Sequence, residues 1–337
     1  MDVRLRRGGR RVNLALGVLL VAGALSGLGA NTIGVNWPLD LIQIHAAAAL
    51  GILLLAPWKS LVVRRGLRRP RRRRPVKWLS LTLLSAVLIT IASGLIHSTG
   101  HLERVGPLTL MQIHVGAAVL AGVVLVAHFV SHPVRPRRTD LDRRALLRAA
   151  VTGAGAAVAV AVWDNAVATD RRFTGSVPRA AFDARTMPVT SWIDDRVQRI
   201  EPARWTLAVG GARLDLAAVL ALPHDRFTAT LDCTSGWYAE QEWEGVRLDR
   251  LLAAAGVEAG RSVEVRSATG YIRWFGAVAL DEVWLGTRLG GRPLSYGHGY
   301  PARIVAPGRR GFWWVKWVTD VQPSDRPAWA QSVFPLT

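Results

Sequence analysis

Long apolar runs separated by short polar segments fill the first half of the chain. Five of them approach the roughly 20 residues that a helix needs to cross a bilayer. They lie at about 12–34, 39–58, 78–97, 108–130 and 145–162. The pattern predicts an N-terminal all-α transmembrane helix bundle of four helices, with a fifth helix as an additional anchor.

Beyond residue 170 the apolar runs become short, and alternating segments mix with segments whose apolar positions have helical spacing. We expect strands at 205–209, 227–231, 262–267 and 271–275, and helices at 214–222 and 247–255, the second helix after a turn at Gly245. The chain is therefore expected to contain a four-helix transmembrane domain (1–134), a basic linker with the fifth helix (135–169) and an exported α+β domain (170–337).

Basic residues are concentrated between the apolar runs. Residues 1–169 hold 22 of the 43 Lys and Arg residues but only 6 of the 24 Asp and Glu residues, which gives +16 of the net charge of +19. Most of these cations lie at 59–77 and 135–148, whereas the two opposite loops hold only Arg104. The positive-inside rule places the N-terminus in the cytoplasm and, after five crossings, the C-terminal domain on the extracellular or periplasmic side of the cell membrane. The expected partner of these basic blocks is the lipid bilayer and not nucleic acid.

The fifth apolar run has a second interpretation. Just before it, residues 142–148 are Asp-Arg-Arg-Ala-Leu-Leu-Arg, which resembles a twin-arginine export signal. An ordinary cytoplasmic arginine pair at the end of a membrane helix explains the same residues. Both interpretations leave the C-terminal domain exported, provided that the fifth run spans the bilayer.

An internal repeat in the helical half aligns two histidines. Residues 41–50 echo residues 110–119, and the repeat places His45 and His114 at matching depths. A histidine in lipid is costly and usually functional, and two histidines across a four-helix bundle are placed to bind a haem iron from both faces. We therefore predict a cytochrome b-like domain in which His45 and His114 hold haem b. Interhelical hydrogen bonds are the alternative role of the pair.

The sequence leaves open whether a third histidine contributes to the haem site and whether a second haem is bound. His97, at the outer end of the third run, is an alternative iron ligand or a partner of a haem propionate. His128 lies 14 residues after His114, a spacing that two-haem membrane cytochromes use. The matching position after His45 holds Lys59, so an inner haem lacks a symmetric pair of ligands.

The chain has one cysteine, Cys233, at the end of an expected strand and at the start of a Thr-Ser-Gly turn. A single cysteine cannot form an internal disulfide, and without neighbouring His or Cys residues it is a poor zinc site. A thiolate at a strand end is a candidate nucleophile or a soft ligand for a metal. A buried thiol packed as a small hydrophobe is the alternative.

A glycine-rich basic stretch follows at 298–318. Its cations are Arg303, Arg309, Arg310 and Lys316. Backbone amides at glycine turns, together with such cations, suit a phosphate or pyrophosphate group. The alternative is a solvated basic loop beside a strand.

Four short motifs of the C-terminal half occur in a distinctive order. They are Leu-Asp-Cys-Thr-Ser-Gly-Trp at 231–237, Gly-Val-Arg-Leu at 245–248, and His-Gly-Tyr-Pro-Ala-Arg at 298–303, followed by Gly-Phe-Trp-Trp-Val-Lys-Trp at 311–317. Together they resemble the molybdopterin domain of the sulfite-oxidase family over about 173–322. The resemblance implies an α+β sulfite-oxidase-type molybdopterin domain in which Cys233 binds the molybdenum of Mo-molybdopterin. It also implies cofactor contacts from His298, Arg303, Trp314, Val315, Lys316, Thr190, Ser191, Trp192 and Thr269.

One departure from that family concerns the substrate. Sulfite oxidases follow the cysteine with an arginine-bearing segment, whereas Trp237, Tyr238 and Glu240 follow it here. This difference argues against sulfite as the substrate. We expect Trp237 and Tyr238 to contact a different small molecule beside Cys233.

The chain is more similar to the bacterial, methionine-sulfoxide-reductase-like branch, in which a molybdenum subunit is paired with a haem membrane subunit; here both parts are fused. The prediction is a membrane-bound molybdenum-dependent oxidoreductase that performs oxygen-atom or related two-electron chemistry outside the cytoplasmic membrane and relays electrons through the haem. A quinone or another membrane electron carrier is the candidate redox partner. Two alternatives are a cofactor-free binding or sensor module on a membrane anchor, and a haem electron carrier without molybdenum chemistry.

Overall fold

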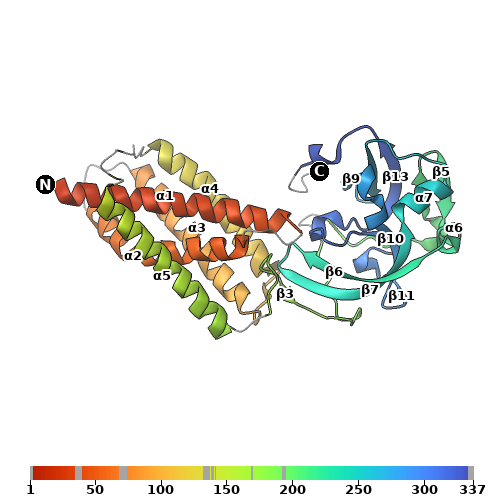
Figure 1. Ribbon diagram of the computed structural model, residues 1–337, viewed down its shortest axis with the longest axis horizontal. Helices are drawn as coiled ribbons and strands as arrows, with labels where there is room; N and C mark the ends of the chain where they lie inside the picture. The colour runs from red at the N-terminus through yellow and green to blue at the C-terminus, as the bar shows by residue number, and fades with distance from the viewer. Residues whose placement is uncertain are drawn as a thin grey trace. The chain divides into compact units, whose positions relative to one another are not determined.

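The computed structural model describes residues 3–34, 40–67, 74–131, 137, 140, 142–167, 170–191 and 195–332. The chain divides into two compact units, a helical unit of Met1–Asn31 and Asn36–Val177 and a sheet unit of Thr32–Val35 and Pro178–Thr337 (Figure 1). This division into long helices and a mixed-sheet domain confirms the fold class that the hydrophobic pattern predicts.

Five long helices build the helical unit. They are α1 (Val3–Thr32), α2 (Leu41–Leu67), α3 (Arg74–Ser98), α4 (Leu110–Ser131) and α5 (Arg143–Val167). Within the described residues, each of the five contains a span that is long and apolar enough to cross a membrane. Large apolar side chains such as Val18, Leu88 and Val123 are exposed on these helices, as expected for surfaces that face lipid. A short hairpin of β1 (Arg104–Val105) and β2 (Leu108–Thr109) connects α3 to α4.

The fifth helix is packed into the bundle. α3 packs along α4, and α2 packs along α5. Gly155 of α5 lies at the second contact, where a Cβ would be in ordinary van der Waals contact with Leu54 of α2 at 3.7 Å. At the start of α5, Asp142 accepts a hydrogen bond of 2.8 Å from the Ala145 amide and pairs with Arg11 of α1 at 2.6 Å. The arginine pair of the export-signal interpretation therefore lies in the first turn of a capped and packed helix.

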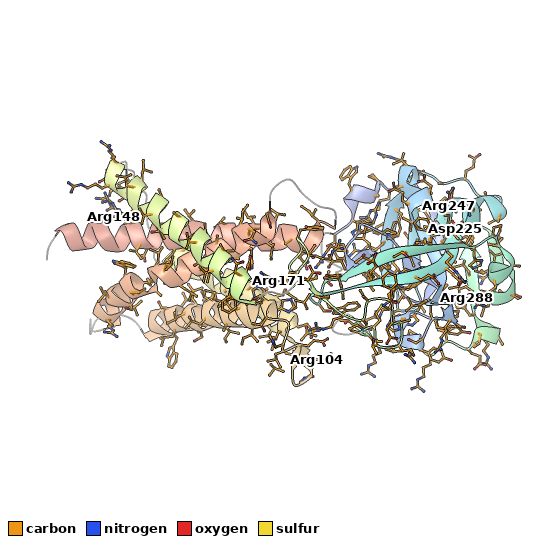
Figure 2. All side chains as sticks on the ribbon, turned by 60° about the horizontal axis from the view of Figure 1, so that its bottom comes forward. Arg104, Arg148, Arg171, Asp225, Arg247 and Arg288 are labelled. Carbon is orange, nitrogen blue, oxygen red and sulfur yellow. The ribbon has the colours of Figure 1, made fainter. Side chains whose placement is uncertain are left out.

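The loops of the helical unit lie at its two ends. Figure 2 shows Arg104, in the β1–β2 hairpin, at the opposite end of this unit from Arg148, in the first turns of α5. The same arrangement is expected of a bundle whose alternate loops lie on opposite sides of a bilayer.

Two sheets build the second unit. The six-stranded sheet has the order β11-β10-β7-β3, with β12 paired to β10 and β6 paired to β7, and the five-stranded sheet has the order β5-β4-β13-β8-β9. The strands are β3 (Val177–Pro178), β4 (Thr206–Val209), β5 (Ala212–Asp215), β6 (Asp225–Cys233), β7 (Trp237–Arg247), β8 (Ser262–Ser267), β9 (Ile272–Gly276), β10 (Trp284–Leu289), β11 (Arg292–Pro293), β12 (Arg303–Val305) and β13 (Val318–Ser324). The helices α6 (Leu216–Ala221) and α7 (Leu248–Ala254) accompany them. Trp243, Leu251 and Phe275 are fully buried in the core of this unit.

Most of the short elements expected in this half are present. The strands β4, β6, β8 and β9 and the helices α6 and α7 match the predicted segments. The turn expected at Gly245 is wrong, because this residue lies inside β7. A Cβ on Gly245 would lie 2.5 Å from the carbonyl oxygen of Leu285, so the close approach of β10 requires a glycine there. The pattern also misses β10 and β12, whose positions are nearly all buried and therefore do not alternate.

Candidate active site

Cys233 is the last residue of β6, in the hairpin that joins β6 to β7. The two strands pair residue by residue from Asp225 and Gly245 to Cys233 and Trp237. Because side chains alternate along a strand, Cys233 and Trp237 point to one face of the hairpin, and their neighbours Asp232 and Tyr238 point to the other. The thiol is partly exposed. The predicted position of the cysteine, at a strand end beside a turn, is therefore confirmed.

A chain of hydrogen bonds surrounds the thiol. Cys233 Sγ lies 3.1 Å from the hydroxyl of Ser235, which donates to Thr190 Oγ1 at 3.3 Å. The indole nitrogen of Trp237, a buried side chain, donates to the same oxygen at 3.0 Å. Next to Thr190, the hydroxyl of Ser191 is buried without a hydrogen-bond partner among the described residues. An unsatisfied buried hydroxyl is costly, so this one is a candidate contact for a bound group.

Arg303 is a buried cation that is held by carbonyl oxygens and aromatic rings. Its guanidinium donates to the carbonyls of Ile304, His298 and Trp314 at 3.3, 3.1 and 3.0 Å. Its central carbon lies 5.4 Å from the ring centre of Trp243 and 5.5 Å from that of Trp314. Burial lowers the pKa of Arg303 to about 10, and the nearby charge of Cys233 opposes this shift.

Lys316 is a second cation beside the same thiol. Its ammonium group donates to the carbonyls of Thr190 at 2.9 Å and Gly297 at 2.7 Å. Burial, followed by the charge of Arg303, lowers the pKa of Lys316 to about 7, and Cys233 again opposes the shift. Neither cation has a carboxylate within hydrogen-bond distance among the described residues. Such a pair, withdrawn from water and bonded only to carbonyls, fits an anionic group such as a phosphate.

His298 is buried and neutral. Its Nε2 donates to the carbonyl of Met187 at 3.1 Å, and its Nδ1 accepts from the hydroxyl of Ser295 at 2.8 Å. Burial is the main cause that lowers its pKa to about 4, and the charges of Arg303 and Lys316 add to it. His298 therefore adds no charge to the site, and it holds the turn whose Gly297 carbonyl binds Lys316.

The other residues that the resemblance implies as cofactor contacts do not all lie near Cys233. Trp314 is buried on Arg303, and the carbonyl of buried Val315 accepts from the amide of Ile304 at 2.7 Å. Thr269 is exposed and its hydroxyl lies 3.1 Å from that of Ser267, with no hydrogen bond to the residues around Cys233 among those described. Trp192 lies outside the described residues.

Three residues of the quoted motifs and the basic stretch have contacts that the sequence does not predict, and Arg310, expected among the cations of a phosphate site, is instead paired with a carboxylate. Ser235 contacts the thiol directly, and Asp232 and Arg310 form a buried ion pair next to it. The position of Ser235, two residues after the cysteine in a tight turn, is a signal for the first of them. No sequence signal connects Asp232 to Arg310, because the two residues are 78 positions apart.

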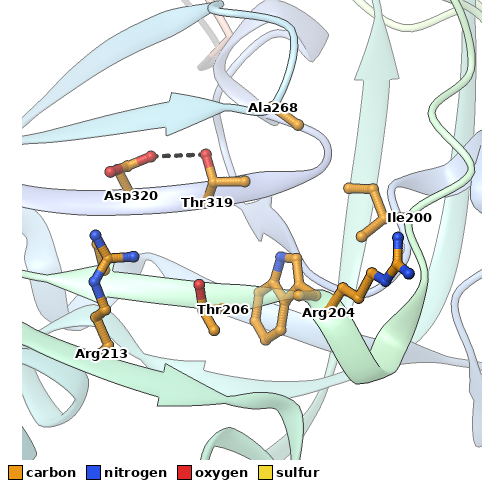
Figure 3. Close-up of a pocket in the computed structure, with 9 residues that line it drawn as sticks. Ile200, Arg204, Thr206, Arg213, Ala268, Thr319 and Asp320 are labelled. Carbon is orange, nitrogen blue, oxygen red and sulfur yellow. Dashed lines mark hydrogen bonds between the residues drawn. The ribbon is translucent and has the colours of Figure 1, made fainter.

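A pocket of about 300 Å³ lies elsewhere in the sheet unit, over β4 and β13 (Figure 3). It is lined by Ile200, Arg204, Trp205, Thr206, Ala208, Arg213, Ala268, Thr319 and Asp320. None of the predicted cofactor residues lines it, so it is separate from the cluster around Cys233.

Lys316 should give the cofactor-free protein a characteristic pH dependence. Its pKa is about 7 in the folded chain against an ordinary value of 10.5, so between these values the unfolded chain binds more protons. The free energy of unfolding therefore rises with pH in this range, by up to about 1.4 kcal/mol per pH unit from this group. We expect a steeper rise above neutral pH in the wild type than in Lys316→Met, measured on the full chain by tryptophan fluorescence during unfolding. Equal slopes would contradict the assignment.

In the helical unit, His45 and His114 lie close together. Their ring centres are 5.7 Å apart. The Nδ1 atom of His45 is bonded to the carbonyl of Gly23, and that of His114 to the carbonyl of Thr90, each at 2.8 Å. Because a carbonyl only accepts, both Nδ1 atoms carry the proton, and both Nε2 atoms keep a lone pair for a metal.

The helices opposite the two histidines carry glycines at matching positions. A Cβ on Gly27 would lie 2.8 Å from His45 Cε1, and one on Gly94 would lie 3.0 Å from His114 Cε1. The two halves of the internal repeat therefore make equivalent glycine–histidine contacts, in addition to having similar sequences. Among the described residues no group of three or more His, Cys, Asp or Glu side chains gathers around a metal position, but a haem iron needs only two axial ligands from the protein.

Comparison with known proteins agrees with the site in the sheet unit. Residues 194–332 match the family of the oxidoreductase molybdopterin binding domain. This match lies within the sheet unit. Among solved structures, the sulfane dehydrogenase SoxCD from Paracoccus pantotrophus matches with 28% identity and a TM-score of 0.37, over 39% of this chain and 40% of that chain. The match thus spans less than half of the length of that protein. No curated protein matches the chain.

Proposed function

We propose that the chain is a membrane-bound molybdenum-dependent oxidoreductase that acts on a small molecule outside the cytoplasmic membrane and relays electrons through a haem b in its helical unit. The observation that carries the proposal is that the single thiol is linked through Ser235 to Thr190, whose carbonyl binds Lys316, and lies within charge interaction of both Lys316 and Arg303. Both cations are hydrogen-bonded to carbonyls alone. A bound Mo-molybdopterin supplies oxygen-atom or related two-electron chemistry, and a haem supplies one-electron transfer.

Each residue of the site has a distinct role in this proposal. Cys233 is the soft thiolate ligand of molybdenum. The hydroxyl of Ser235, 3.1 Å from the sulfur, is placed to donate its hydrogen bond to a thiolate there instead of to Thr190. Arg303 and Lys316 supply positive charge for the phosphate of the pterin, where exclusion of water strengthens each interaction. Neutral His298 positions the turn that binds Lys316.

The substrate side of the site is defined by β7. Trp237, Tyr238 and Glu240 lie on this strand, just after Cys233 in the sequence, and they bring no cation to the site. We propose a small substrate other than sulfite for this reason. Trp237 shares a face with Cys233 and is the stronger of the two candidates for substrate contact, because Tyr238 points to the opposite face.

His45 and His114 are the proposed axial ligands of a haem b. Their fixed tautomers and their symmetric packing on Gly27 and Gly94 support this pair. His97 is the weaker candidate, because the internal repeat places Ala30 at its matching position.

We propose a cytoplasmic N-terminus and an exported sheet unit. The concentration of cations in alternate loops and the opposite placement of Arg104 and Arg148 in the helical unit support this orientation. The packing of α5 on α2 supports a retained membrane helix. A quinone or another membrane electron carrier is the proposed redox partner of the helical unit.

Metal and haem analysis of the purified full chain tests the proposal. Protein made in a host that synthesises the pterin is expected to contain molybdenum and haem in amounts equimolar with the chain. Haem without molybdenum would indicate an electron carrier, and the absence of both would indicate a cofactor-free module. Either outcome would contradict the proposal.

The glycine contacts give a specific prediction for the haem site. Gly27→Ala places a methyl group 2.8 Å from His45 Cε1, so the imidazole must turn and its Nδ1 bond to Gly23 must lengthen. We expect haem affinity to fall by about tenfold, the lower end of the cost of disturbing a ligand's supporting contacts. The measurement is haem per chain by pyridine haemochrome absorbance during titration. Gly122→Ala on α4 is the matched control, because a Cβ there meets nothing within 4 Å; equal affinity in both variants would refute the assignment.

A further inference from the structure

A buried ion pair lies directly behind the cysteine. Arg310 Nη1 bonds to Asp232, and both side chains are only 3% exposed. Arg310 Nη2 also approaches the carbonyl oxygen of Cys233 at 3.5 Å. The backbones of Asp232 and Arg310 form a parallel bridge, so the arginine joins the loop after β12 to the end of β6.

Gly311, the residue after Arg310, lies close to the backbone at the end of β6. A Cβ on Gly311 would lie 3.0 Å from Cys233 Cα and 3.3 Å from the carbonyl oxygen of Asp232. A side chain at this position would push the loop away from the end of β6 by a few tenths of an ångström. The same loop continues into Trp314 and Lys316, whose carbonyl and ammonium groups belong to the cationic side of the site.

Stability alone is a poor explanation for this pair. Taking two charges out of water costs several kcal/mol, and their attraction often does no more than offset that cost. The hairpin also carries an ordinary ion pair at its other end, where Arg226 is 64% exposed and lies 2.7 Å from Glu244. Among the ion pairs of this hairpin in the described residues, the pair beside the cysteine is the buried one.

We propose that Asp232 and Arg310 are positioning residues that fix the backbone of Cys233 against the loop 308–316, so that the thiolate and the cations are presented to one ligand in a constant geometry. The pair acts from behind the cysteine, since Asp232 points to the face opposite the thiol. This inference rests on the proposed function, in which Cys233 binds molybdenum.

The first test uses the full chain made without the pterin, and it needs no molybdenum. Cys233 is the only cysteine, so iodoacetamide labelling reports on this one position. In Asp232→Asn we expect labelling to be faster by about tenfold, because the buried Arg310 loses its opposite charge and local opening of the hairpin end becomes easier. Glu244→Gln, which breaks the exposed pair on the same hairpin, should label at the wild-type rate. Equal rates in all three proteins would overturn the proposal.

A second variant covers the case in which Asp232→Asn does not fold. Arg310→Lys keeps the charge but has no planar fork with which to reach both Asp232 and the Cys233 carbonyl. We expect it to fold and to label faster than the wild type, by less than Asp232→Asn. Wild-type labelling in a folded Arg310→Lys chain would contradict the proposal.

The third measurement separates positioning from mere stability. Molybdenum-loaded Arg310→Lys is expected to show a Mo(V) electron paramagnetic resonance spectrum with g-values shifted from those of the wild type. A structural role alone would lower the loaded fraction and leave the g-values of that fraction unchanged, which would contradict positioning. If the wild type binds no molybdenum at all, the proposed function fails, and the labelling comparison still decides whether the pair holds the cysteine.

Discussion

Replacing Cys233 with alanine is expected to lower molybdenum-dependent turnover by more than about 100-fold, the upper end of what changes around a metal ligand cost. The chain has no second thiol that replaces it. The neighbouring groups Ser235 and Thr190 offer neutral hydroxyls, which are poor substitutes for a soft thiolate. The measurement is molybdenum per chain together with substrate-linked oxidation or reduction of a dye. The haem spectrum should be unchanged, because the haem ligands lie in the other unit.

Thr234→Ala is the matched control for this variant. Thr234 lies next to Cys233 in the same turn and is partly exposed, and its side chain has no hydrogen bond among the described residues. It should keep molybdenum and turnover near the wild-type level. Full activity in Cys233→Ala, or an equal loss in Thr234→Ala, would refute the assignment of the cysteine as the ligand.

Replacing either His45 or His114 with alanine is expected to remove most of the bound haem. The two rings lie 5.7 Å apart with Nδ1 atoms held by carbonyls, so each supplies one Nε2 to the proposed iron position. Losing one of two axial ligands should lower the haem-binding affinity by at least about 100-fold. The reduced-minus-oxidised absorbance of the purified chain measures the loss. Molybdenum content should remain, because Cys233 and its cations belong to the sheet unit.

His101→Ala is the control for the two histidine variants. His101 is exposed just beyond α3 and has no repeat partner. We expect a wild-type haem spectrum from it. An unchanged spectrum in both His45→Ala and His114→Ala would show that other residues hold the haem, with His97 as the first alternative to examine.

The helical half is the part of the molecule that the sequence predicts best. Runs of apolar residues near the length of a bilayer crossing determine the five helices, and the repeat alone identifies His45 and His114 as a pair. The contacts with Gly27 and Gly94 are harder to foresee, because they depend on which face of each helix meets its neighbour.

In the sheet half, the sequence motifs are recognised, but the contacts between distant segments are not predicted. Cys233, Arg303 and Lys316 are recognised from their motifs, and the structure brings them together with Thr190. The turn predicted at Gly245 is wrong, because the sequence does not distinguish a glycine in a turn from a glycine packed against a neighbouring strand. The ion pair of Asp232 with Arg310 depends on a bridge between segments 78 residues apart, which local patterns do not encode.

The most direct test of the account is to replace the sulfur of Cys233 with selenium. Because the chain has a single cysteine, a cysteine auxotroph supplied with selenocysteine and ordinary methionine places selenium at this one position. Selenium-edge X-ray absorption of the purified full chain, loaded with cofactor, then reports the neighbours of that atom. We predict a molybdenum atom directly bonded to selenium. A selenium atom surrounded only by carbon and other light atoms, in protein that contains molybdenum, would contradict the account.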